Sequence, residues 1–256
     1  MKKIIVLILT ALLLTGCGEV VTPAVTTSAT VQTEIPTTVP ETTVATEPPH
    51  SALYLEDLPV EDVIRYFNEV CLDAEYINAG DPSLLQKWVN PISYHIEGQP
   101  TEEDLAKLET FSAWLNEIPG FPGIVPADSQ LAANLAIHFC TEQELLEILG
   151  DNFYGNDGGV TFWYNGANQI YNAIICYRTD LEQITRNSVI LEELYNGLGP
   201  VQDTNLRSDS VIYAGYSTPQ ELTRIDELIL KLLYSPEMKC GMTAAECETV
   251  IRSLYY

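Results

Sequence analysis

Basic residues are scarce in this sequence. The 256 residues include 12 lysines and arginines against 36 aspartates and glutamates, which gives a formal net charge of −24. Binding to nucleic acid through phosphate contacts needs a basic face, and so does binding to an anionic membrane through a polybasic patch. The composition excludes both classes. It does not exclude a folded core, because 46% of the residues are apolar.

The apolar run near the N-terminus is too short to cross a bilayer. It extends from Ile4 to Leu14 and has 11 residues, whereas a membrane-spanning helix needs about 20. Because Lys2 and Lys3 precede it, the run is typical of the hydrophobic region of a secretory signal peptide. Removal of this leader would leave 10 basic residues against 36 acidic ones, a net charge of −26.

The segment Leu14-Thr15-Gly16-Cys17 resembles the lipobox of bacterial lipoproteins, which has an apolar residue and two small residues before a cysteine. The resemblance implies a signal peptide over residues 1–16 and diacylation of the Cys17 sulfur. Two acyl chains anchor a protein stably, whereas one binds only reversibly. We therefore expect a lipid anchor on the outer face of the bacterial cell membrane. A plain secretory signal with an incidental cysteine is the alternative.

Residues 17–50 have the composition of a disordered stalk. Between Val21 and His50 the sequence has ten threonines and five prolines, and it has neither basic nor aromatic residues. Such a segment cannot bury enough apolar surface to offset the entropy of ordering it. We expect a tether that lifts the following domain off the membrane. A linker without a length requirement is the alternative.

Predicted helices and strands follow one another along residues 51–256. This order indicates a single α+β domain with a mixed sheet covered by helices. Periodicity and capping boxes predict helices over 59–78, 101–115, 141–150, 181–198 and 218–233, and a last one from 243. Strands are predicted over 92–96, 135–140, 160–164 and 170–177. Asn165-Gly166 between the last two strands indicates a hairpin.

The segment from Glu192 to Gln202 has the skeleton of the metzincin motif, H-E-x-x-H-x-x-G-x-x-H followed by a Met-turn. Glu193 stands where the motif has its general base, and Gly199 stands at the motif glycine. Ser210-Val211-Ile212-Tyr213 looks like the Met-turn with isoleucine in the methionine position. The resemblance implies a zincin-like, more narrowly metzincin-like, architecture for the α+β domain.

The region from about Trp88 to Met242 is also similar to a bacterial secreted family known as domain of unknown function 2927. The similarity covers roughly 150 of the 256 residues. It rests on a Leu-Glu-Glu-Leu core and on a few positions after it, namely Leu198-Gly199, Asp203, Ser210 and Leu233-Tyr234.

All three histidine positions of the motif are changed, to Glu192, Asn196 and Gln202. A catalytic zinc takes three protein ligands, and although Glu192 could ligate, two neutral amides would not complete the site. Without a metal, Glu193 has no activated water from which to take a proton. We therefore predict an inactive peptidase scaffold with no metal and no catalytic residue beyond the residual general-base position of Glu193.

The three histidines of the chain do not rebuild the site. His50 belongs to the stalk, and His95 and His138 lie on predicted strands. Two alternatives stay open. One is an active metal-dependent hydrolase that uses Glu193 with a non-standard metal site. The other is a structural envelope lipoprotein without a ligand.

The resemblance to metzincin peptidases implies a groove along the edge strand of the hairpin. In that family an extended peptide is held in this groove by strand addition. That strand is 160–164, and the candidate groove residues are Phe162, Tyr164, Glu193 and Asn196. We expect extended peptide or peptidoglycan-associated material as the partner. Ordinary packing of the aromatic residues in the core is the alternative, since alternate residues of a strand face the core.

Calcium is the one cofactor for which the sequence offers candidate ligands. Asp203, Asp209 and Glu192 could hold it after the motif helix, because carboxylates suit hard cations. Solvated surface carboxylates are the alternative on so acidic a chain.

The cysteine count leaves an odd number once Cys17 carries lipid, so at least one of the other five is free. Disulfides persist outside the cytoplasm. We predict a bridge between Cys240 and Cys247, with Cys140 and Cys176 as the second candidate pair.

Overall fold

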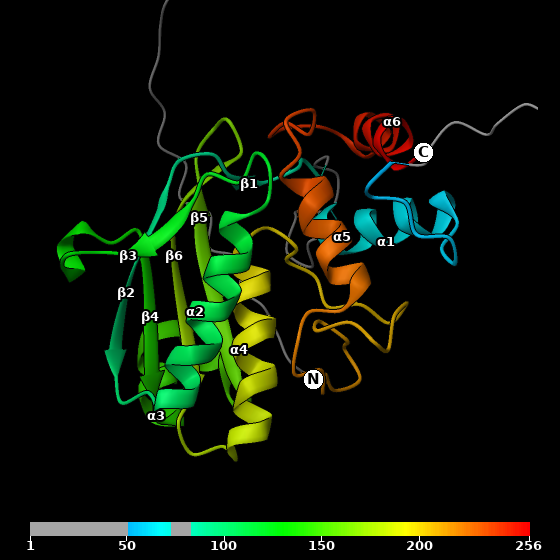
Figure 1. The fold of residues 1–256 in the computed structure, drawn as a ribbon. Coiled ribbons are helices and arrows are strands. Elements are labelled where there is room, and N and C mark those ends of the chain that lie inside the picture. The colour runs from blue at the N-terminus through cyan, green and yellow to red at the C-terminus, as the bar shows by residue number, and fades with distance from the viewer. Residues whose placement is uncertain (1–50, 73–82) are drawn as a thin grey trace, which may run out of the picture. The chain divides into compact units, whose positions relative to one another are not determined.

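A mixed sheet of six strands organises the part of the chain that the structure describes, residues 51–72 and 83–256 of a computed structural model (Figure 1). The strand order is β1-β6-β4-β2-β3, with β5 paired to β6. The β5–β6 pair is antiparallel and the other pairs are parallel. The strands are β1 Lys87–Trp88, β2 Ile92–Gly98, β3 Ile124–Pro126, β4 Leu135–Cys140, β5 Gly158–Tyr164 and β6 Gln169–Arg178.

Helices cover both faces of this sheet, which explains why β4 and β6 are apolar along most of their length. The helices are α1 Val60–Leu72, α2 Glu102–Asn116, α3 Glu142–Leu149, α4 Gln183–Gly197, α5 Arg224–Leu233 and α6 Ala244–Tyr255, with short 3₁₀ turns at Gln130–Ala132 and Asp151–Phe153. Figure 1 shows α2 and α4 side by side on one face and α1, α5 and α6 gathered on the far side of α4.

The two faces of β5 and β6 contact different helices. On one face, a Cβ placed on Gly197 of α4 would lie 3.2 Å from Ile175 and 3.5 Å from Val160. On the other face, a Cβ placed on Gly159 would lie 2.8 Å from Leu149 of α3. The main core lies on the α4 face, and a smaller cluster with Cys140 and Cys176 lies on the α3 face. The α+β prediction is thereby confirmed.

Three of the four predicted capping boxes start helices as expected, those of Thr101, Thr141 and Thr243. The predicted start at Thr218 is wrong, because α5 begins at Arg224 with Thr223 as its N-cap. The Asp226 carboxylate accepts hydrogen bonds from Thr223 N at 3.0 Å and from Thr223 Oγ1 at 2.7 Å. The side chain of Gln220 instead donates to Ser188 Oγ at 2.8 Å, which holds the segment before α5 against α4.

The predicted helix over 59–78 is described as α1 up to Leu72, and its remainder lies outside the described residues. The leader, Cys17 and the stalk also lie outside them. Within 51–72 and 83–256, no helix is long and apolar enough to cross a membrane.

Candidate functional site

The segment from Glu192 to Gln202, which resembles the metzincin motif, begins in the last turns of α4, where the helix is buried almost completely, and continues past its end at Gly197. The helix end is fixed by two aromatic donors that satisfy terminal carbonyl groups: Trp88 Nε1 donates to Gly197 O at 2.9 Å, and Tyr234 OH donates to Leu198 O at 2.7 Å. Gly199 then turns the chain with φ of +129°, and a Cβ there would lie 2.8 Å from Gln86 O. The motif glycine is therefore required by backbone conformation and by close contact.

Glu193 lies under the start of β5. A Cβ on Gly158 would lie 2.9 Å from Glu193 Cγ and 2.6 Å from Val189 Cγ1, so the glycine lets α4 approach the strand closely. The Glu193 side chain is only 4% exposed. Burial, and next the nearby Glu193 carboxylate, raise the pKa of Tyr177 well above its usual value. Glu193, predicted to be a residual general-base position, is thus a buried side chain beneath the hairpin strand.

Asn196 lies one turn further along α4 and is 1% exposed. Neither its Oδ1 nor its Nδ2 has a hydrogen-bond partner among the residues that the structure describes. A buried amide without partners costs about 1–3 kcal/mol, and most buried polar groups in proteins are satisfied. The amide of Asn196 is therefore a buried polar group whose donor and acceptor are not used by the described residues.

Glu192 and Gln202, the other two residues at positions where the resembled motif has histidine, differ from each other. Glu192 is 3% exposed and belongs to the same buried stretch of α4. Gln202 comes after the turn, where its backbone N donates to Val70 O at 3.2 Å and its Nε2 donates to Asp203 O at 3.3 Å. The amide nitrogen of Gln202 is thus used by the chain itself.

The histidines of the domain lie away from α4. His95 and His138 belong to the neighbouring strands β2 and β4, and His138 Nδ1 lies 3.6 Å from a carboxylate oxygen of Glu97. By the alternation along β4, His138 shares a face with Cys140, which is the α3 face of the sheet. An imidazole cluster beside the motif is not formed by the described residues.

The predicted groove residues on β5 have different surroundings. Phe162 is 1% exposed and belongs to the core, so its side chain offers no surface to a ligand. Tyr164 is half-buried and packs against the same core. Among the described strands, β5 pairs with β6 alone and ends the sheet on that side. A partner at this edge would meet the main chain of β5 more than the Phe162 ring.

The segment that looks like a Met-turn is held by a buried carboxylate. Asp226 Oδ1 accepts a hydrogen bond from Ser210 Oγ at 2.7 Å, and Asp226 Oδ2 accepts one from Val211 N at 3.2 Å. Tyr66 OH of α1 donates to Ser210 Oγ at 2.7 Å. Burial raises the pKa of Asp226, although four hydrogen bonds oppose that effect. Sequence reasoning missed Asp226 and Tyr66, and the Thr223-to-Asp226 capping box was the signal that could have found the former.

The candidate calcium ligands do not form a recognised cluster. Asp209 forms an ion pair of 2.7 Å with Arg207, which lowers the pKa of the Asp209 carboxyl. No group of three or more histidine, cysteine or acidic side chains suited to a metal occurs in residues 51–72 and 83–256.

The five cysteines of the described domain are free thiols, so the predicted bridge between Cys240 and Cys247 is not formed. Cys240 Sγ donates to Lys87 O at 3.6 Å, and Cys247 is fully buried. Burial raises the pKa of the Cys247 thiol to about 12. Both sulfurs therefore have protein surroundings that suit the protonated thiol.

Comparison with known families gives a match to the model described as Protein of unknown function (DUF2927), over residues 60–253. No curated protein matches the chain. The match includes the whole region from Trp88 to Met242 in which the sequence resembles this family, and extends beyond it at both ends. Because it spans well over half of the 256 residues, the chain belongs to the family of proteins of unknown function DUF2927.

Proposed function

We propose that this protein is a lipid-anchored extracytoplasmic binding protein. Its domain is a metzincin-like scaffold without the catalytic metal, and it holds an extended peptide, such as a peptide of the cell wall, beside β5 and α4. The acyl chains on Cys17 anchor the protein to the membrane, and residues 17–50 connect the domain to this anchor.

The order of elements supports the metzincin-like part of the proposal. An antiparallel hairpin strand, β5, is followed by β6 and then by the motif helix α4. After α4 come the turn at Gly199, a buried segment with Ile212 fully enclosed, and α5. This is the sequence of parts that the motif resemblance implies.

The changed histidine positions support a binding role over catalysis. Two of them carry neutral amides, and the chain's two described histidines lie on β2 and β4. Amide groups are poor zinc ligands but pair well with the peptide group, because each offers a donor and an acceptor.

The observation that carries the proposal is the Asn196 amide. It is buried on the helix beneath the end strand of the sheet, and both of its polar atoms lack a partner among the described residues. A peptide that pairs with the main chain of β5 would have to extend between the strand and α4 to reach this amide, where its polar groups would supply the missing donor and acceptor.

The test compares binding with stability in two variants. Asn196→Leu removes the amide but keeps the side-chain size, so binding of an extended peptide should fall about tenfold or more, the loss expected for about 1.4 kcal/mol of hydrogen bonding. The free energy of unfolding should stay within about 1 kcal/mol of the wild type or rise, because a buried unsatisfied amide is replaced by an apolar group.

Asn152→Ala is the matched control, since Asn152 is an exposed amide in the turn after α3 and should leave both quantities unchanged. Calorimetric titration with peptidoglycan stem peptides and with extended peptides, together with urea unfolding, provides both readouts. Unchanged peptide affinity in Asn196→Leu would contradict the assignment of the site. Stoichiometric zinc in the purified protein would favour the hydrolase instead.

A further inference from the structure

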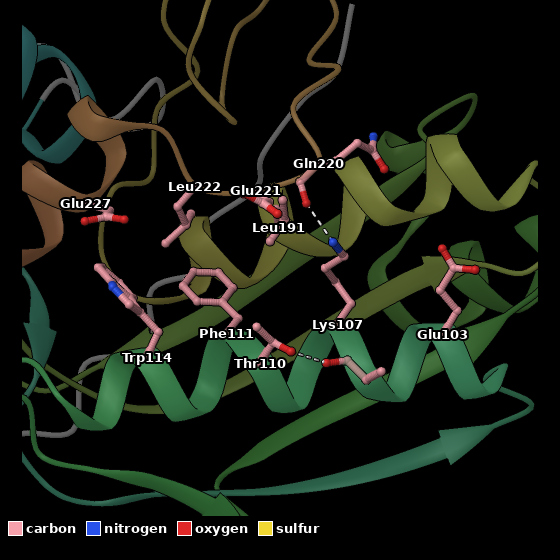
Figure 2. Close-up of a pocket in the computed structure, with 11 residues that line it drawn as sticks. Glu103, Lys107, Thr110, Phe111, Trp114, Leu191, Gln220, Glu221, Leu222 and Glu227 are labelled. Atoms are coloured by element: carbon pink, nitrogen blue, oxygen red, sulfur yellow. Dashed lines mark hydrogen bonds between the residues drawn. The ribbon is translucent and has the colours of Figure 1, made fainter.

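A cavity of about 460 Å³ lies outside the motif region, between α2, α4 and the segment that precedes α5 (Figure 2). This volume is in the range of small-molecule sites, about 300–1,000 Å³. Its lining includes none of Glu192, Glu193 and Asn196. It is therefore separate from the proposed peptide site.

One end of the cavity is apolar. Phe111 and Trp114 come from α2, Leu191 comes from α4 and Leu222 comes from the segment before α5, and Figure 2 shows all four side chains directed toward the same space. Phe111 and Leu191 are each 3% exposed, which makes them a fixed floor. The Phe111 and Trp114 rings lie 6.2 Å apart at 47°. This end suits an aromatic or branched aliphatic group.

Carboxylates surround the mouth of the cavity. Glu103, Glu221 and Glu227 line it together with one lysine, Lys107. The Lys107 ammonium donates to Gln220 O at 2.6 Å, as the dashed line in Figure 2 marks, so its charge is directed at the backbone. Glu221 is exposed and takes part in no ion pair within the described part of the chain.

An ammonium group of the protein itself already lies at this rim. Lys231 Nζ is 2.8 Å from a Glu227 carboxylate oxygen and 5.6 Å from the centre of the Trp114 ring. A cation over the face of a tryptophan is attracted by the ring, and a carboxylate beside it adds to that attraction. Lys231 therefore occupies the cation position between Glu227 and the Trp114 ring, which leaves Glu103 and Glu221 as the lining carboxylates without an ion pair among the described residues. The net charge of −24 draws cations toward the whole molecule.

We propose that this cavity binds a small amphipathic amine. The apolar body of the ligand packs against Phe111, Leu191 and Leu222, and its ammonium group lies at the mouth beside Glu221. A carboxylate of the same size would meet the acidic rim and be repelled. A neutral analogue would keep the apolar contacts and lose the charge interaction.

The test titrates the full chain with three probes of one shape, phenethylammonium, 2-phenylethanol and 3-phenylpropionate, and follows the Trp114 resonances by NMR. The amine should bind about two- to fivefold more tightly than the alcohol, the fold-change expected of an exposed ionic contact. The carboxylate should bind most weakly, and added salt should reduce the preference for the amine.

Variants then separate charge from packing. Glu221→Gln should remove about half of the preference for the amine over the alcohol, and Leu222→Ala should weaken both ligands. Glu109→Gln is the matched control, because Glu109 is an exposed acid of the same helix α2 that does not line the cavity. Equal binding of all three probes, no binding of the amine, or an amine preference that is unchanged in Glu221→Gln would each overturn the proposal. None of these readouts depends on Asn196.

Discussion

Asp104 and Arg186 join the N-terminal turns of α2 and α4 through a buried ion pair. The Asp104 carboxylate is fully buried, and Arg186 Nε lies 2.8 Å from it. Burial opposes ionisation of Asp104, but hydrogen bonds from Arg186, Thr101 and Gln183 outweigh it, and the pKa is lowered. Breaking such a pair leaves an uncompensated charge in the interior.

Asp104→Asn should therefore lower the free energy of unfolding by about 3 kcal/mol at neutral pH. Because the folded pKa is depressed, the contribution of Asp104 is complete above the unfolded value near 4 and is lost as the pH falls below it. The variant should consequently show a flatter loss of stability in acid. Urea unfolding from pH 2 to 7 measures both effects.

The control for this prediction is the exposed pair of Asp62 and Arg65, joined at 3.2 Å on α1. Asp62→Asn should change stability by no more than about 0.5 kcal/mol. A loss of stability of similar size in both variants would contradict the claim that burial makes the Asp104–Arg186 pair the stronger contributor.

Lys87 is a second buried charge, 7% exposed, with Nζ donating to Leu233 O at 2.7 Å and to Met238 O at 2.6 Å. Burial lowers its pKa to about 8. Between this value and about 10.5 the unfolded chain binds the proton and the folded chain does not, so the contribution of Lys87 to stability rises with pH in that window.

Lys87→Met should destabilise the protein by about 1–3 kcal/mol at pH 7, because it leaves two buried carbonyl groups without a donor. The deficit against the wild type should grow from pH 8 to pH 10. Chemical unfolding at the two pH values checks this, with Arg65→Met, which replaces an exposed cation of α1, as the control. A deficit that does not change with pH would contradict the depressed pKa.

At the scale of elements, the spacing between β5 and α4 determines the candidate site. Gly158 allows this spacing, since a Cβ there would lie 2.6 Å from Val189 Cγ1 and 3.0 Å from Cys176 O. Overpacking of this kind forces neighbouring side chains or backbone to shift.

Gly158→Ala should cost about 1–3 kcal/mol of stability and weaken peptide binding, because the strand and the helix must move apart. Gly166→Ala is the matched control in the same hairpin, where a Cβ would meet nothing within 4 Å. Its effect should be within about 0.5 kcal/mol. Thermal unfolding and peptide titration of both variants make the comparison, and an equal effect of the two alanines would contradict the close packing.

Much of the element pattern could be predicted from local signals. The Leu135–Cys140 strand and the helices that begin after Thr101, Thr141 and Thr243 follow from apolar periodicity and capping boxes, which act within a few residues. The predicted helix start at Thr218 is wrong because the side chain of Gln220 donates a hydrogen bond to Ser188 of α4. This contact depends on tertiary packing, which the local sequence pattern does not contain.

The candidate site was predictable only in part. The positions of Glu192, Glu193 and Asn196 on one helix follow from the motif, but their burial depends on how α4 packs against β5 and β6. The sequence also predicted the strand of Phe162 correctly. It did not decide whether the side chain lies in a groove or in the core, because that depends on how the strand packs against α4. Asp226 lay outside the prediction because its partners Ser210 and Val211 are 16 and 15 residues away in the chain.

At the scale of the whole molecule, the acidic net charge determines which kind of membrane attachment we propose. A net charge of −24 is repelled by an anionic membrane surface, so attachment by charge is excluded and attachment by acyl chains on Cys17 is the mechanism we propose. A threonine- and proline-rich segment between anchor and domain would keep the acidic domain at a distance from the lipid headgroups.

Cys17→Ser should accordingly move the protein from the membrane fraction to the soluble extracytoplasmic fraction and abolish incorporation of labelled fatty acid. The domain itself should be unaffected, so its unfolding midpoint serves as the internal control. Retention of the variant in the membrane fraction would contradict the lipid anchor.

The measurement that tests the central claim most directly is a calorimetric titration of extended peptide into the purified protein with EDTA present. The account predicts binding with unchanged affinity in chelator, recovery of intact peptide afterwards, and an affinity about tenfold or more lower in Asn196→Leu. Binding that disappears with EDTA and returns with zinc, or peptide recovered as fragments, would contradict an inactive scaffold that recognises its ligand through an amide.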